Sequence, residues 1–224
     1  MKQIISILNY IDTAAPLLTL FFFIKPFKKL TKELRFIFWF VCIQFVTNLI
    51  SGSFEIIYNW SDHSIFLPNY SVYALNIILS FGVLTALFYQ LNIPVIKKLA
   101  PVFSILFTIC AVFSLSKGDG FDSYNSELSA MASFVITAYC LIFFYWRLVK
   151  DTQLTGLTNS SFFWIVIGLF TYYMGSFFIF ITYNFLIANK LEALATLWRF
   201  HNVLLTIFCI YTIYALTCKN YQKT

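Results

Sequence analysis

The sequence predicts an all-α membrane protein, a bundle of seven transmembrane helices that forms a single domain over residues 1–224. Three observations predict this class. Charged residues make up 11% of the chain, less than half of the about 25% that is usual in a soluble domain. Hydrophobic residues make up 60%, and the mean hydropathy is +0.81. Long apolar stretches follow one another along the whole chain, which leaves no room for a separate soluble domain.

Each apolar stretch has about the length that a membrane helix needs, roughly 20 residues. The seven predicted spans cover 3–24, 36–58, 70–91, 100–116, 126–148, 161–187 and 194–217. We expect the first to remain in the protein, because its basic cluster follows the apolar run, which reverses the order of a signal peptide. The fourth is the shortest, and Pro101 suits its first helical turn. Short polar breaks separate the spans, with Gly118, Gly120 and Gly156 at turn positions.

The charges divide unevenly between the two sets of loops. One side holds eleven basic and two acidic residues, and the other side holds four basic and seven acidic residues. Because cytoplasmic loops carry an excess of Lys and Arg, we predict that the N-terminus is outside and the C-terminus inside. The expected location is the cytoplasmic (inner) membrane of a bacterium. The net charge of +6 is thus an orientation signal, and no nucleic-acid partner is expected.

Several chemistries lack the residues that they require. The five cysteines lie in or at the ends of apolar stretches without Cys-x-x-Cys spacing, so neither disulfides nor a zinc site are expected. The last span has no interior lysine for retinal, and no Pro-Gln pair is present. Ser176 with His201 resembles a serine-protease dyad, but the glycine spacing is wrong. We therefore predict no cofactor, no metal and no catalytic residue, and favour a protein that is not an enzyme.

Polar residues inside the spans recur at helical spacing, so that they share one face of a helix. In the second span the spacing is 4-3-4, and the face holds Gln44, Asn48, Ser51 and Glu55. The third span repeats this spacing with Asn69, Tyr73, Asn76 and Ser80. Polar groups in hydrocarbon are costly, and they mark either functional sites or helix-to-helix hydrogen bonds.

These faces predict a polar cavity in the outer half of the bundle, lined by the first, second, third, sixth and seventh spans. The candidate ligand-binding residues are Asp12, Gln44, Asn48, Glu55, Tyr73, Asn76, Arg199, His201 and Asn202. We expect Arg199 to pair with Asp12 or Glu55, because a lone guanidinium at that depth is costly. Two structural interpretations stay open: the amides and hydroxyls join helices to one another, and the residues near the interface extend to water.

Three segments resemble small multi-pass proteins of similar length from flavobacterial-type bacteria. They are QFVTNLIS in the second span, NYSVYALNIILSFGVLTALFYQ in the third and LWRFHNVLLTIFCIYTIYAL in the seventh. Members of that group tend to keep a Tyr at Tyr73 and a His at His201, and to place an acid where this chain has Gln44 and Asn76. The resemblance implies the same topology and a role for His201, and it implies no reaction.

The sequence thus predicts a membrane protein of receptor or sensor type that binds a small molecule or a lipid. A cytoplasmic partner is expected to dock on the basic loop Lys25–Arg35, although that loop equally suits a stop signal lying on anionic lipid. A small transporter or channel is the first alternative, with Gln44 and Tyr139 continuing the cavity inward. A structural or assembly subunit without catalytic activity is the second.

Overall fold

The computed structural model describes residues 2–24, 26–60, 69–116, 123–150, 160–189 and 191–218, and within these ranges the chain is helical without strands. The helices are α1 (Lys2–Ile24), the short 3-10 helix η1 (Phe27–Lys29), α2 (Lys32–Trp60), α3 (Tyr70–Gln90), α4 (Pro94–Ser116), α5 (Ser126–Lys150), α6 (Ser161–Asn189) and α7 (Leu191–Thr217). Lys25, the turn glycines Gly118, Gly120 and Gly156, and the tail 219–224 lie outside the described residues.

In the described part of the chain, six helices are long and apolar enough to cross a membrane. Their apolar stretches are Lys32–Tyr58, Tyr70–Gln90, Pro94–Ser116, Ser126–Val149, Ser161–Ile187 and Thr196–Thr217. Among the described side chains of α1, an apolar stretch covers Ile11–Ile24, which alone is shorter than a membrane span. The chain is therefore an all-helical, multi-pass membrane protein, and a seventh crossing by α1 stays a prediction.

Helix α4 differs from the predicted fourth span, because it begins at Pro94 and not near residue 100. Pro94 occupies the first turn, whereas Pro101 lies inside the helix, so the predicted place of Pro101 was wrong. The sequence Pro-Val-Ile already offers a helix start, since a proline loses no hydrogen bond in the first turn. Ile96 is buried, while Lys97 and Lys98 are exposed. The helix therefore opens with an amphipathic turn ahead of the apolar run.

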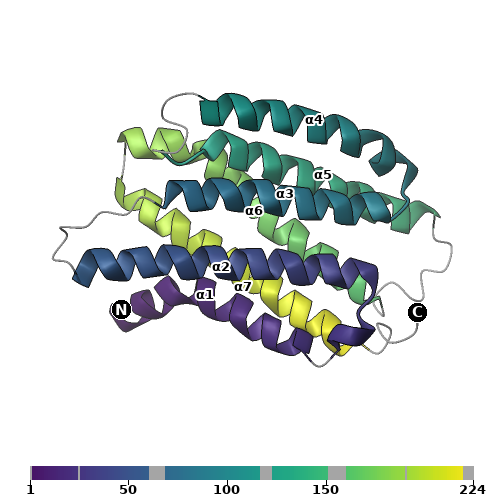
Figure 1. Cartoon of the computed structure of the whole chain (residues 1–224), viewed down its shortest axis with the longest axis horizontal. Helices are drawn as coiled ribbons and strands as arrows, with labels where there is room; N and C mark the ends of the chain where they lie inside the picture. The colour runs from purple at the N-terminus through teal and green to yellow at the C-terminus, as the bar shows by residue number, and fades with distance from the viewer. Residues whose placement is uncertain are drawn as a thin grey trace.

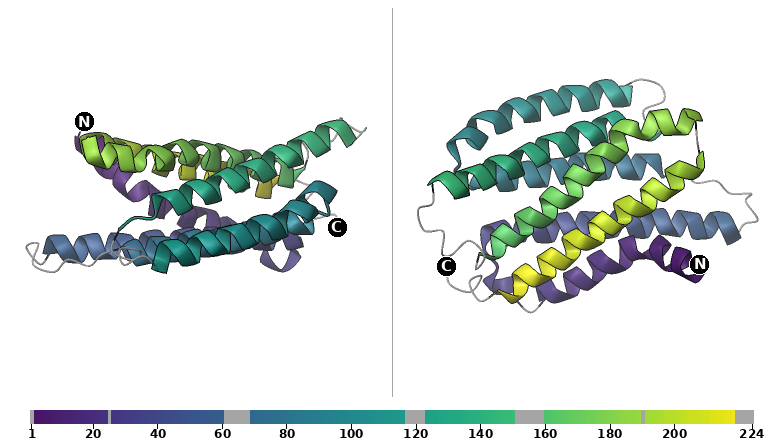
Figure 2. Two further views of the ribbon diagram at one scale, coloured as in Figure 1. Left: turned by 90° about the horizontal axis from the view of Figure 1, so that it is seen from above. Right: turned by 180° about the vertical axis from the view of Figure 1, so that it is seen from behind.

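Consecutive helices run antiparallel along the bundle (Figure 1). Helix α1 begins at the end where α2, α4 and α6 finish, called here the N-terminal end, and α7 finishes at the opposite, C-terminal end. Helix α7 packs between α6 and α1, and α2 packs between α1 and α3. Helix α5 joins α6 to α3 and α4, and α4 lies at the edge of the bundle. Seen from behind, α6 and α7 run obliquely across α2 and α3 (Figure 2).

Packing is tightest between α6 and α7, where glycines let the helices approach. A Cβ atom on Gly168 would lie 3.0 Å from Tyr211 Cβ, and one on Gly175 would collide with Leu204. Small residues at a membrane helix interface allow such an approach. Toward the C-terminal end the core is aromatic, with Phe40 and Phe208 fully buried and their ring centroids 5.4 Å apart. The bundle is thus closed by aromatic rings at that end.

Candidate functional site

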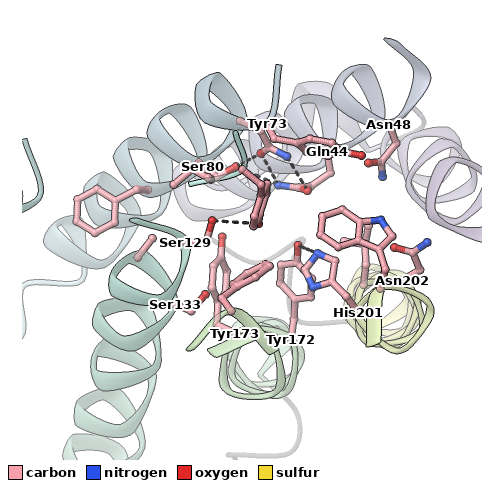
Figure 3. Close-up of a pocket in the computed structure, with 18 residues that line it drawn as sticks. Gln44, Asn48, Tyr73, Ser80, Ser129, Ser133, Tyr172, Tyr173, His201 and Asn202 are labelled. Carbon is pink, nitrogen blue, oxygen red and sulfur yellow. Dashed lines mark hydrogen bonds between the residues drawn. The ribbon is translucent and has the colours of Figure 1, made fainter. Parts of the chain in front are cut away.

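A small polar cavity lies between the helices, with a volume of about 60 Å³. Its polar and aromatic lining residues are Gln44, Asn48, Tyr73, Asn76, Ser80, Phe81, Tyr124, Ser129, Ser133, Tyr172, Tyr173, Phe180, Trp198, His201 and Asn202. They come from α2, α3, α5, α6 and α7, and from the segment just before α5. Figure 3 shows the α2 and α3 side chains on one side of the cavity and those of α6 and α7 on the other.

Side-chain amides and a hydroxyl join α2 to α3 at the wall of the cavity. Gln44 Nε2 donates to Asn76 Oδ1 at 3.0 Å and to Ser80 Oγ at 3.0 Å. Asn76 Nδ2 donates back to Gln44 Oε1 at 3.3 Å, and Ser80 Oγ donates to Asn76 Oδ1 at 2.7 Å. Gln44 and Ser80 are each 4% exposed. Gln44, Asn76 and Ser80 are each hydrogen-bonded to the other two residues. This network of neutral groups fixes the three side chains of the wall in one geometry.

The two polar faces predicted at 4-3-4 spacing therefore meet each other. About two turns closer to the N-terminal end, Ser51 Oγ lies 2.8 Å from Tyr73 Oη and accepts a hydrogen bond from Asn69 Nδ2 at 2.8 Å. Glu55 continues the same face of α2 but is exposed and does not line the cavity. The shared faces thus serve the α2–α3 contact as well as the cavity.

Asp12 on α1 accepts hydrogen bonds from two of the lining amides, those of Asn48 and Asn202. Asn48 Nδ2 donates to the Asp12 main-chain oxygen at 2.7 Å, and Asn202 Nδ2 donates to Asp12 Oδ2 at 3.3 Å. Asp12 itself does not line the cavity. It is therefore a positioning residue, which sets the amides of α2 and α7 without contacting the space between them.

His201 on α7 is held by two side chains of α6. Its Nδ1 lies 2.9 Å from Ser176 Oγ, and its Nε2 lies 3.3 Å from Tyr172 Oη. The Ser176–His201 pair has the separation of a nucleophile and its base. However, Ser176 is only 1% exposed and does not line the cavity, so its hydroxyl does not meet a substrate there. The pair orients the imidazole ring along the cavity wall.

Three aromatic rings narrow the cavity toward the N-terminal end. The ring centroids of Tyr73, Tyr124 and Trp198, called here the aromatic triad, are 5.5–6.0 Å apart, and the rings are nearly perpendicular to one another. Tyr73 precedes Asn76 along α3, and Trp198 precedes His201 along α7, so the triad lies nearer that end. Burial raises the pKa of Tyr124 well above its ordinary value, and its phenol therefore stays protonated.

The structure brings together six of the nine predicted site residues. These are Gln44, Asn48, Tyr73, Asn76, His201 and Asn202, which all line the cavity. Asp12 is one hydrogen bond away, whereas Glu55 and Arg199 are not lining residues. Within the described residues, Arg199 forms no ion pair with Asp12 or Glu55, so the expected pairing was wrong. The partly buried Arg199 does not need one, since a long cationic side chain can reach the interface.

The predicted lining omitted one helix, because α5 contributes to it, whereas none of the α1 side chains that the structure describes, residues 11–24, lines the cavity. Ser129 and Ser133 of α5 line the cavity, and Ser129 Oγ contacts Tyr124 Oη at 3.0 Å. Their spacing with Ser126 is 3-4, a short polar face that would have indicated this role. Tyr173 and Phe180 also line the cavity. No sequence pattern distinguishes them, because aromatic residues are abundant throughout the chain.

The lining is chemically neutral. Among the lining residues that the structure describes there is no Asp, Glu, Lys or Arg, and His201 is the one basic side chain. In the part of the chain that the structure describes, no three His, Cys, Asp or Glu residues group as metal ligands do. A charged ligand would meet no counter-ion among these described residues, whereas a neutral one would meet amides and hydroxyls beside apolar side chains such as Ile77, Ala132 and Leu205.

No protein-family model, no curated protein and no solved structure matches this chain. The residues of the cavity are therefore the basis for assigning a function, and the resemblance to flavobacterial-type proteins stays a prediction.

Proposed function

We propose that this chain is a receptor- or sensor-type protein of a bacterial cytoplasmic membrane, which binds a small, uncharged, hydrogen-bonding solute in its polar cavity. It crosses the membrane seven times, with the N-terminus outside and the C-terminus inside, and the solute enters from the outside. The observation that carries the proposal is the neutral character of the described lining residues, among which amides and hydroxyls of five helices converge on one space.

The size of the cavity limits the solute. Its volume of about 60 Å³ is well above the roughly 15 Å³ that one water needs. It is well below the roughly 300–1,000 Å³ of sites for drug-sized ligands. A solute of a few heavy atoms, such as a small amide or polyol, fits both this volume and the donor and acceptor pattern.

The distribution of charges supports the direction of entry. The cavity extends from the middle of the bundle toward the N-terminal end, where Tyr73, Tyr124 and Trp198 line it. At the C-terminal end, Lys28, Lys32, Arg35, Lys97 and Lys98 are exposed. Basic residues mark the cytoplasmic side, and the opposite, cavity-bearing end is then the outer one.

A closed inner end favours binding over passage. Tyr139, which a transporter would need as the inward continuation of the cavity, does not line it. It is fully buried and packs against Phe88 and Phe103, with ring centroids 5.5 Å and 6.1 Å away. A sensor of this kind passes its signal to a partner, and the exposed Lys28, Lys32 and Arg35 of the basic loop suit an acidic cytoplasmic surface.

A thermal-shift series with matched probes tests the proposal. Acetamide, urea and glycerol should raise the unfolding temperature of the purified protein, while acetate and guanidinium of similar size should not. The shift should shrink in Gln44→Leu and Ser80→Ala, which alter the cavity wall. It should persist in the matched controls Gln90→Leu and Ser53→Ala, whose side chains are exposed.

Equal shifts with the charged probes, or shifts that survive in both cavity variants, would contradict the proposal. Uptake of the stabilising probe into vesicles that contain the protein, abolished by Gln44→Leu, would instead favour the transporter alternative. Stabilisation without uptake would favour a receptor.

A further inference from the structure

A second hollow, separate from the polar cavity, runs along the seam between α3 and α4. Its volume is about 570 Å³. On α3 it is lined by Ile78, Phe81, Gly82, Thr85, Ala86 and Tyr89, which share one helical face. The opposing face of α4 supplies Ala100, Pro101, Ser104, Phe107, Thr108 and Leu115, among others. This α3–α4 groove lies wholly within two of the apolar stretches that can cross a membrane.

The groove exists because small residues face each other at an edge of the bundle. A Cβ atom placed on Gly82 would meet no atom within 4 Å. The stacked rings of Phe81 and Phe107, with centroids 3.9 Å apart, form its floor. Phe81 also lines the polar cavity, so the two spaces share this side chain as part of their walls. The groove is therefore mainly apolar and lies beside α4 at the edge of the bundle.

Two lysines, Lys97 and Lys98, lie at one end of the groove. Lys97 Nζ lies 5.9 Å from the centroid of the Tyr89 ring, which lines the groove. Lys97 and Lys98 are both exposed and precede Ala100 and Pro101 on α4 by less than two turns. Neither α3 nor α4 contains an acidic residue. The α3–α4 groove thus combines an apolar trough with a cationic, aromatic end.

The dimensions match one leaflet of a bilayer. From Ile78 to Tyr89 the groove follows eleven residues of α3, roughly 16 Å at about 1.5 Å per residue. One leaflet supplies half of the roughly 30 Å hydrocarbon core. An acyl chain that lies in the groove therefore places its glycerol and phosphate at the level of Tyr89 and Lys97.

We propose that the α3–α4 groove is a binding site for an anionic phospholipid, with one acyl chain along Gly82 and Ala86 and the phosphate headgroup on Lys97 and Lys98. This site is independent of the solute that the polar cavity binds. A basic pocket beside membrane helices prefers anionic headgroups, and each lysine contributes about a fivefold preference over a zwitterionic lipid.

Native mass spectrometry of the full chain tests the site, with equimolar dioleoyl phosphatidylglycerol and dioleoyl phosphatidylcholine as probes. The unmodified protein should retain phosphatidylglycerol preferentially. The double variant Lys97→Gln/Lys98→Gln should lose this preference while still retaining a lipid. The matched double variant Lys28→Gln/Lys32→Gln, which also removes two exposed lysines at the C-terminal end, should keep the preference.

A tryptophan at Gly82 should fill the trough, and Gly82→Trp should therefore lower the total amount of lipid retained. Gly52→Trp is the control, because a Cβ at Gly52 likewise meets nothing within 4 Å but lies on α2, outside the groove. Equal retention of both lipids by the unmodified protein would overturn the proposal. A preference for phosphatidylglycerol that survives in Lys97→Gln/Lys98→Gln would also overturn it. Because both lysines are exposed, this variant should fold and keeps the test decisive even if Gly82→Trp does not fold.

Discussion

Gln44 on α2 and Asn76 on α3 exchange two hydrogen bonds through their side-chain amides, at 3.0 and 3.3 Å. Neither residue is charged, and each uses both its donor and its acceptor on the other. Inside a membrane such a pair satisfies groups that hydrocarbon cannot. The pair joins two helices and at the same time faces the polar cavity, so it serves structure and recognition together.

Breaking the amide pair should destabilise the protein. Gln44→Leu and Asn76→Leu should each lower the free energy of unfolding by about 1–3 kcal/mol, because each leaves a polar partner unsatisfied. The double variant should cost less than the sum, since it removes both partners. Unfolding in mixed detergent micelles measures these values, with the exposed Gln90→Leu as control. Strict additivity would show that the two amides do not interact.

The acceptor at Asp12 should matter more than its charge. Asp12→Asn keeps an oxygen that Asn202 Nδ2 can reach, whereas Asp12→Leu leaves the buried amide of Asn202 without this acceptor. We expect Asp12→Leu to cost about 1–3 kcal/mol and Asp12→Asn to cost much less. Glu55→Leu, at an exposed position, should stay within about 0.5 kcal/mol. Equal losses in the two Asp12 variants would mean that the carboxylate charge is essential.

The four glycines within the described helices should divide into two groups according to the space around them. Gly168→Ala and Gly175→Ala should each destabilise the protein by about 1–3 kcal/mol, because the added methyl group overpacks the α6–α7 contact. Gly52→Ala and Gly82→Ala meet open space and should gain up to about 1 kcal/mol from higher helix propensity. Thermal unfolding of the four variants decides the matter. A gain at Gly175 would show that α6 and α7 are not packed as closely as described.

The aromatic triad should control access to the cavity. A cysteine introduced as Ser133→Cys lies in the cavity wall, and Trp198→Ala should increase its rate of labelling by a water-soluble thiol reagent. Trp39→Ala, which removes an exposed ring elsewhere, should leave the rate unchanged. The parent chain with its five native cysteines provides the background. An unchanged rate in Trp198→Ala would mean that the solute path avoids the triad.

Periodicity predicted the helical bundle and much of the cavity because hydrocarbon penalises every unsatisfied polar group. Gln44, Asn48, Asn76 and Asn202 stood out for that reason, and the structure places them around one space. The presence of a charged residue in a predicted span predicted the lining of the cavity less well than the spacing of the amides did. Glu55 and Arg199 lie near helix ends, where a side chain can reach water without a partner.

Other features depend on three-dimensional packing that no single helix reveals. The entry of α5 into the cavity wall follows from its position between α6 and the α3–α4 pair. The floor of the α3–α4 groove depends on Phe81 stacking on Phe107, two residues with no distinguishing pattern among 28 phenylalanines. The N-terminal bound of α4 was missed because two lysines interrupt the apolar run without interrupting the helix.

The most direct test of the account is the sidedness of labelling at Ser133→Cys with a membrane-impermeant thiol reagent. A polar cavity that opens to the outside predicts labelling in intact cells and protection in inside-out vesicles, in each case above the parent background. Labelling from inside-out vesicles alone would contradict both the proposed orientation and the outward opening of the cavity.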